Sequence, residues 1–176
     1  IAPIQVVIVP IFRNKEQKNL VQDYIDDIIN KLIVSNIRYR VDWSDASPGY
    51  KFNDWEMKGV PIRMEIGPRD IESNMVVIAR RDSGEKNSVS SDKVEDEISR
   101  LLIDIQRQLF NQSKKFRDSN THVVKTYEDF KNIIKSGGFV RCGWDGSEET
   151  EEKIKNETKA TIRCIPFDEN PEKLKC

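Results

Sequence analysis

The stretch that decides the fold is PGYKFNDWEMKGVPIRMEIGPRDIESNMVVIARRDSGEK, residues 48–86. The serine before it and its first proline favour a short helix, which we extend to Lys58 and end at Gly59. The alternating IRMEI at 62–66 and the apolar MVVIARR at 75–81 predict two strands. The segment GPRDIESN between them has the residue types of a turn. We therefore expect a helix followed by two neighbouring strands.

The residues before this stretch predict a strand, a helix and a second strand. IQVVIV at 4–9 is a β-branched run without alternation, as in strands buried on both faces. Residues 15–35 place apolar side chains at helical spacing, and IRYRVD at 37–42 alternates. This order favours a right-handed crossover between parallel strands. With an edge strand at 89–91 and a long helix at 93–116, the predicted fold class is α/β, a mixed five-stranded sheet flanked by helices.

A second domain is predicted after Arg117, where the composition becomes polar. We place the boundary there, which gives domains at 1–117 and 118–176. The polar segment 118–125 is interpreted as a loop that contains His122. Capping and stop residues then predict helices at 127–135 and 147–158, and strands at 139–144 and 160–167. The second domain is therefore expected to be a smaller, incomplete α/β domain.

Composition and charge exclude several classes of protein. The 176 residues include 29 Lys and Arg and 30 Asp and Glu, so the net charge of −1 does not indicate a nucleic-acid binder. It does not exclude one either, because a local patch is invisible in a sum. No apolar run is long enough to span a bilayer, and the start lacks a basic, signal-like segment. The odd, sparse set of Cys142, Cys164 and Cys176 fits a reducing compartment. Without an initiator methionine, the sequence is interpreted as a piece of a longer chain.

The sequence offers no recognisable set of catalytic groups. His122 has no acid or nucleophile assigned to it by the sequence, so an ordinary surface histidine is favoured. Phosphate-loop, dinucleotide-binding, HExxH and CxxC patterns are absent. Asp42 and Asp45 could form an acid–base pair, but loop capping and solvent exposure explain them better. No catalytic or metal site is therefore predicted in this chain.

The charged residues between Lys51 and Lys86 are harder to assign. Seven basic and seven acidic side chains surround a few aromatic ones. One interpretation is a surface lattice of salt bridges, each contributing under about 1 kcal/mol. The members of such a lattice are Arg63, Glu65, Arg69 and Asp70. The other is a binding site, because balanced donors and acceptors suit the reading of hydrogen-bonding edges. Spacing alone favours neither the salt-bridge lattice nor the binding site. It also leaves open whether Phe52 and Trp55 belong to the core or form a stacking platform for bases, with the core favoured for Trp55.

Three segments of the chain resemble prolyl-tRNA synthetase of the archaeal and eukaryotic type, a class II enzyme. They are APIQVVIVPI at 2–11, PGYKFNDWEMKGVPIRMEIGPRD at 48–70 and TKATIRCIPF at 158–167. The resemblance implies an anticodon-binding domain at 1–117 followed by the C-terminal domain of that family. The catalytic motifs, which bind ATP and proline, would lie upstream of Ile1. The parent enzyme would be a proline–tRNA ligase that uses ATP and Mg²⁺, and this part would hold no catalytic residue.

The resemblance also implies which residues read the anticodon. The family recognises the two guanines at the second and third anticodon positions of proline tRNA. Guanine offers N1–H and N2–H to a carboxylate, and its O6 accepts from Arg or Lys. The residues at the matching positions are Glu56 and Asp70 as acceptors, Arg63, Arg69 and Lys86 as donors, and Phe52 as a candidate for stacking. Arg69 stands where some relatives carry Lys, and Lys86 aligns only after a small shift in the turn.

Metals and partners follow from the same resemblance. Many members hold zinc in the C-terminal domain with two pairs of cysteines, but this chain has Asp145 and Thr150 where the first pair aligns, so zinc is not expected. The implied partner is tRNA(Pro), and the parent is a cytoplasmic homodimer that involves neither DNA nor a membrane. The alternatives are a synthetase-like accessory module that no longer reads tRNA and a domain that only supports a dimer.

Overall fold

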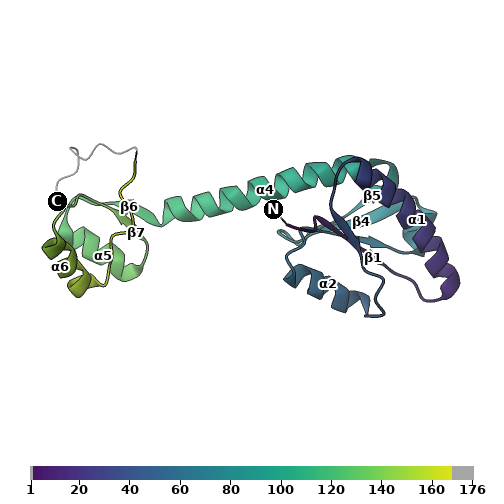
Figure 1. The fold of residues 1–176 in the computed structure, drawn as a ribbon, viewed down its shortest axis with the longest axis horizontal. Helices are drawn as coiled ribbons and strands as arrows, with labels where there is room; N and C mark the ends of the chain where they lie inside the picture. Colours follow the sequence, from purple (N-terminus) through teal and green to yellow (C-terminus); the bar gives the residue numbers. More distant parts are fainter. Residues whose placement is uncertain (1, 168–176) are drawn as a thin grey trace. The chain divides into compact units, whose positions relative to one another are not determined.

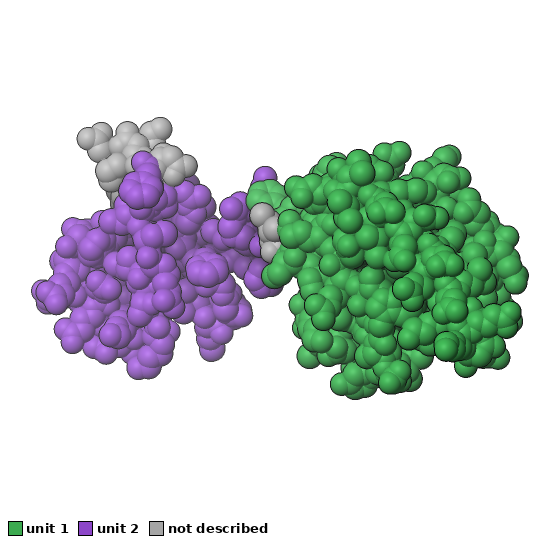
Figure 2. Space-filling view, turned by 45° about the vertical axis from the view of Figure 1, so that its right-hand side comes forward, with its two compact units in different colours: residues 1–110 green, residues 111–176 purple. Residues whose placement is uncertain are grey.

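The computed structural model describes residues 2–167 and divides the chain into two compact units, 1–110 and 111–176, which are coloured separately in Figure 2. The first unit, drawn as a ribbon in Figure 1, is built on a mixed sheet. Its strand order is β2-β1-β3-β4-β5. Its strands are β1 (Val6–Pro10), β2 (Tyr39–Val41), β3 (Ile62–Ile66), β4 (Met75–Arg80) and β5 (Lys86–Ser90). Strand β1 is parallel to both β2 and β3, whereas β4 is antiparallel to β3 and β5 to β4. The predicted fold class is therefore confirmed.

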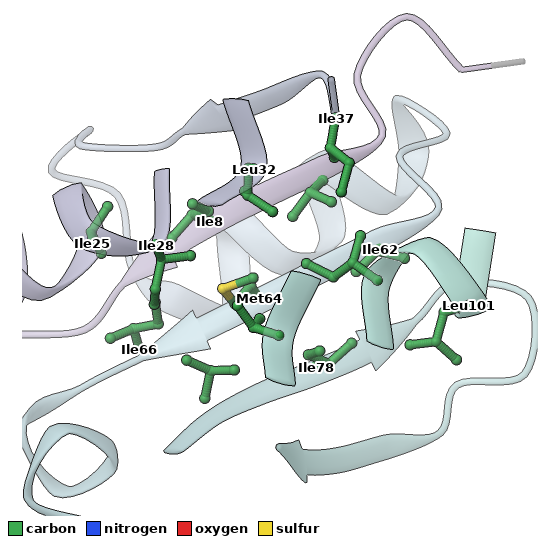
Figure 3. Packing of buried hydrophobic residues seen from close by; sticks show 14 of the residues in the cluster. Ile8, Ile25, Ile28, Leu32, Ile37, Ile62, Met64, Ile66, Ile78 and Leu101 are labelled. Carbon is green, nitrogen blue, oxygen red and sulfur yellow. The ribbon is translucent and has the colours of Figure 1, made fainter. Parts of the chain in front are cut away.

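Helices pack against both faces of this sheet. They are α1 (Lys15–Val34), α2 (Pro48–Met57), the short α3 (Pro68–Glu72), the 3-10 turn η1 (Ser91–Lys93) and α4 (Val94–Ser119). The main core joins α1 and α4 to one face of the sheet, and Met64 of β3 is fully buried there (Figure 3). On the other face, Val7 and Val9 pack with Val60 and with aromatic residues of α2. The alternation of side chains along β1 thus separates the two layers.

Local signals in the sequence account for the ends of α1 and α2. Asn14 accepts a hydrogen bond from the Gln17 N–H at 2.8 Å and caps α1. Ser47 caps α2 in the same way, and a proline occupies the first turn. Gly59 follows α2 with φ of +80°, a left-handed conformation that glycine adopts without strain. These residues fix the start and end of the helix that carries part of the site described below.

Arg80 at the end of β4 connects the sheet to α4. Its guanidinium lies 2.7 Å from the Asp82 carboxylate and 3.1 Å from the carboxylate of Asp104 on α4. The hydrogen bond from Arg80 holds the pKa of Asp82 below its ordinary value. Hydrogen bonds from Arg80 and Arg107 likewise lower the pKa of Asp104. Both carboxylates are therefore ionised at neutral pH, and the network keeps α4 in place on the sheet.

The second unit has a two-stranded sheet and two helices. Its elements are β6 (Thr121–Val123), α5 (Tyr127–Ser136), β7 (Phe139–Arg141) and α6 (Glu148–Thr158). Strands β6 and β7 are parallel. Thr126 and Ser147 cap the two helices, as their sequences predict. The Tyr127 hydroxyl donates to Glu157 at 2.8 Å and links α5 to α6. None of the helices within residues 2–167 is long and apolar enough to cross a membrane.

Three expectations about local structure are wrong. The predicted turn GPRDIESN contains α3, because a proline starts the helix and Asp70 accepts from the Gly67 N–H at 2.8 Å. The predicted loop 118–125 is instead the end of α4, followed by β6, so that the exposed His122 lies in a strand. Residues 160–167 form no strand, since no partner strand pairs with them in the described structure.

Candidate nucleic-acid interface

Arg63 is the centre of a group of charged and aromatic side chains on the α2 face of the sheet. Arg63 and Glu65 stand two residues apart on β3, so both point to this face. The strand register places Arg63 opposite Ala79 of β4, and Ala79 opposite Lys86 of β5. Arg63, small Ala79 and Lys86 therefore form one row across three strands, beside α2.

The contacts within this group are short and continuous. The Arg63 guanidinium donates to Glu56 of α2 at 2.6 Å and to Glu65 at 3.1 Å. The Lys86 ammonium lies 2.7 Å from the same Glu65 oxygen. The Phe52 ring lies beneath both cations, with its centroid 4.1 Å from the Arg63 guanidinium carbon and 5.1 Å from the Lys86 nitrogen. We call these five residues, Phe52, Glu56, Arg63, Glu65 and Lys86, the Arg63 cluster.

The Arg63 cluster has a buried layer and an accessible layer. The side chains of Arg63 and Glu65 are 9% and 11% exposed, whereas those of Glu56 and Lys86 are 49% and 47% exposed. The buried arginine is satisfied by two carboxylates, as a buried charge must be. The Glu56 carboxylate is held by Arg63 and the Lys86 ammonium by Glu65, and both groups remain accessible to solvent. Glu56 presents an acceptor to solvent, and Lys86 presents a donor 5.1 Å from the centroid of the Phe52 ring.

Arg69 and Asp70 lie apart from this cluster in the contacts of the described residues. Both belong to α3, which follows the end of β3. Asp70 is half-buried and uses one carboxylate oxygen to cap its own helix at Gly67. Arg69 is exposed. The structure thus brings together four of the six predicted site residues, and it leaves the other two on a neighbouring short helix with no hydrogen bond or ion pair to the cluster.

Asp42 and Trp55 have structural roles next to the site. Trp55 packs against the smaller core, and its indole N–H donates to the Asp42 carboxylate at 2.7 Å. Burial alone would raise the pKa of Asp42, but hydrogen bonds from Ser44 and Trp55 outweigh it and lower the pKa. Lys51 adds a hydrogen bond to the Asp42 backbone carbonyl at 3.0 Å. Asp42 therefore orders the loop before α2, as its interpretation as a capping residue predicts, and Trp55 belongs to the core.

Glu65 is the member of the cluster that the predicted site omitted. It accepts from both Arg63 and Lys86 and so connects β3 to β5. The alternation of IRMEI contains the signal, because it places residues 63 and 65 on one face of a strand. What the sequence does not show is that this face lies beside α2 and not against the main core.

The described residues hold no group of three or more His, Cys, Asp or Glu side chains that could bind a metal ion. Cys142 and Cys164 are exposed, and the third cysteine of the predicted set, Cys176, lies outside the described residues. The expectation that zinc is not bound stays a prediction.

Comparison with known proteins shows the family to which the chain belongs. Residues 5–101, more than half of the chain, match the family described as anticodon binding domain. The chain therefore belongs to the family of anticodon-binding domains. Residues 127–176 match a second family, described as prolyl-tRNA synthetase, C-terminal. The two matches occur in the order that the resemblance of the sequence predicts.

Individual relatives narrow the assignment to one kind of synthetase. The chain is 46% identical to the proline–tRNA ligase of Phocaeicola vulgatus over 99% of its own length and 35% of the relative. It is 46% identical to the ligase of Porphyromonas gingivalis, over 100% of this chain and 36% of the relative. It is 48% identical to the ligase of Cytophaga hutchinsonii, over 96% of this chain and 35% of the relative. The chain thus spans about a third of these relatives and corresponds to their C-terminal part. The predicted family is confirmed.

Proposed function

We propose that this chain selects tRNA(Pro) by reading the two guanines of its anticodon, and that the longer protein attaches proline to that tRNA with ATP. The observation that carries the proposal is the Arg63 cluster, in an anticodon-binding domain whose relatives are proline–tRNA ligases. Sequence-specific recognition of RNA usually targets unstacked bases through their Watson–Crick edges. A cluster that offers an acceptor, a donor and a ring within a few ångströms fits one such base.

Glu56 is the acceptor that we assign to the first guanine. Its half-exposed carboxylate can take N1–H and N2–H together, while Lys86 donates to O6 or to a nearby phosphate. Arg63 is nearly buried and donates to Glu56 at 2.6 Å, so we assign it the role of orienting Glu56 from below. Phe52, which lies half-buried beneath Arg63 and Lys86, is the residue that we assign to stacking with the base.

Asp70 and Arg69 are assigned to the second guanine. They lie on α3, apart from the Arg63 cluster, as two separate bases require. Asp70 uses one carboxylate oxygen as a cap for α3, which leaves the second oxygen as an acceptor. Arg69 is exposed and supplies a donor for O6 or phosphate. A wrong base opposite Glu56 or Asp70 leaves a carboxylate unpaired, at a cost of about 1–3 kcal/mol.

The longer protein would carry the remaining properties of the family. It would be a cytoplasmic homodimer whose catalytic domain binds ATP, Mg²⁺ and proline, and its part in this chain would bind neither zinc nor DNA. The accessory-module alternative loses support from Glu56 and Lys86, because both stay half-exposed at the Arg63 cluster, as groups that read a base would. A domain that only supports a dimer leaves the same two groups unexplained.

Glu56→Gln should impair the choice of RNA more than the strength of binding. The amide can still accept from Arg63, but it cannot accept N1–H and N2–H together, so the preference for guanine should fall about tenfold. The measurement is a gel-shift titration with tRNA(Pro) and with a version whose anticodon guanines are adenines.

Arg81→Ala is the comparison variant for this experiment. Arg81 is exposed beside the site. If it contacts phosphate, its removal should lower the affinity for both RNAs by the same factor. If Glu56→Gln lowers the affinity for both RNAs by the same factor, Glu56 does not read a base.

A further inference from the structure

A groove of about 570 Å³ in the first unit lies outside the Arg63 cluster. One wall is α4, where Leu102, Ile103 and Leu109 line it. The other wall is formed by the start of the chain, with Ala2 and Gln5, and by the residues before β3. Neither the core nor the proposed base-reading site accounts for this groove.

The α4 wall is apolar and uncovered. The side chains of Ile98 and Ile105 face the sheet and are buried, but Ile103 is 69% exposed and Phe110, one helical heptad further, is 63% exposed. The apolar stripe of α4 is thus wider than the sheet that it packs on. Large apolar side chains exposed beside a groove are typical of a site where another part of a protein binds.

The position of Ala2 identifies the occupant. The greater part of each proline–tRNA ligase relative precedes the region that corresponds to this chain. In such a protein the preceding segment would join the unit at residue 1, next to the groove that Ala2 lines. A segment tethered there has a high effective concentration at the groove, which a second copy of the chain lacks. We propose that the groove, with the exposed apolar wall of α4, is the docking surface for the segment that precedes Ile1 in the longer protein.

This inference rests on the proposal that the chain is the C-terminal part of a longer ligase, but not on the reading of guanine. Its consequence is that the longer protein covers Ile103, whereas the 176-residue chain exposes it. Docking here fixes the position of the base-reading unit against the rest of the enzyme, because α4 is also tied to the sheet through Arg80 and Asp104. The chemistry of the expected contact is apolar, with Arg81 and Asp82 also lining the groove.

The test measures the accessibility of a single cysteine. Ile103→Cys is introduced into the 176-residue chain and into the full-length protein, and each is treated with a maleimide reagent. The rate is followed by mass spectrometry on the peptide that carries the new cysteine. We expect labelling about tenfold slower in the full-length protein, because the thiol reacts only when the docked segment opens. Val34→Cys, at an exposed position on the C-terminal turn of α1 that does not line the groove, should react at the same rate in both.

Two results would overturn the docking proposal. Equal labelling of Ile103→Cys in both proteins would show that the preceding segment does not cover α4. Slow labelling in the 176-residue chain that becomes faster on dilution would show that a second copy covers it instead. Binding of tRNA(Pro) by the same samples is measured separately, so a failure to discriminate guanines would refute the proposed function and leave the labelling result intact.

Discussion

Arg63→Met should lower the free energy of unfolding by about 3 kcal/mol and should abolish the preference for guanine at the first of the two anticodon positions. Arg63 is nearly buried and donates to two carboxylates, and the removal of one partner from a buried ion pair costs about 3–5 kcal/mol. Lys86 still neutralises Glu65 in the variant, which places the loss at the lower end of this range. Glu56 loses the group that orients it, so its carboxylate is no longer held in the orientation that binds the base.

Urea denaturation measures the loss of stability, and RNA titration at a temperature where the variant is folded measures the loss of preference. Arg100→Met is the matched control, because Arg100 pairs with Glu97 on the exposed side of α4. It should change stability by less than about 0.5 kcal/mol and leave RNA binding unchanged. If Arg63→Met behaves like this control, the Arg63 cluster neither stabilises the fold nor organises a site.

Met64→Ala should destabilise the first unit by about 3 kcal/mol without any direct effect on the site. Met64 follows Arg63 on β3, but it points to the other face and is fully buried among residues of α1, α4 and the sheet (Figure 3). Truncation of a buried methionine leaves a cavity and costs about 2–5 kcal/mol. The result to compare is the shift in the urea midpoint at constant slope.

Met57→Ala is the same substitution at an exposed position, since Met57 at the end of α2 is 82% exposed. Its effect on stability should stay within about 0.5 kcal/mol. A Met64→Ala variant as stable as Met57→Ala would mean that the two faces of β3 are assigned the wrong way round.

Much of the first unit could be predicted from the sequence because its signals are local. The β-branched run before Pro10, the Ser-Pro start of α2 and the glycine at 59 each act within a few residues, and the structure has elements at all three places. The helix α3 cannot be predicted from periodicity because five residues are too few, and its start depends on a proline and an Asp70 cap that also occur in turns. Residues 160–167 have the composition of a strand, but a strand exists only where another one pairs with it.

The candidate site shows the same limit. The alternation of β3 placed Arg63 and Glu65 on one side, yet spacing could not tell a salt-bridge lattice from a binding site. The structure gives features of both, because Arg63 and Glu65 are paired and nearly buried while Glu56 and Lys86 retain free surface. The contact of Lys86 with residues of α2 and β3 depends on the register of β5, which the sequence alone does not specify. The boundary between the domains, predicted at 117, stays a prediction.

The most direct test of the central claim uses the unmodified 176-residue chain and two RNA hairpins. One is the anticodon stem-loop of tRNA(Pro), and the other differs only in having both anticodon guanines replaced by adenine. Adenine offers no N1–H or N2–H to a carboxylate, so each exchange should cost about 1–3 kcal/mol. Fluorescence-anisotropy titration at fixed salt should therefore show the guanine hairpin bound at least about thirtyfold more tightly. Equal affinity for the two hairpins would contradict the claim that this domain reads guanine.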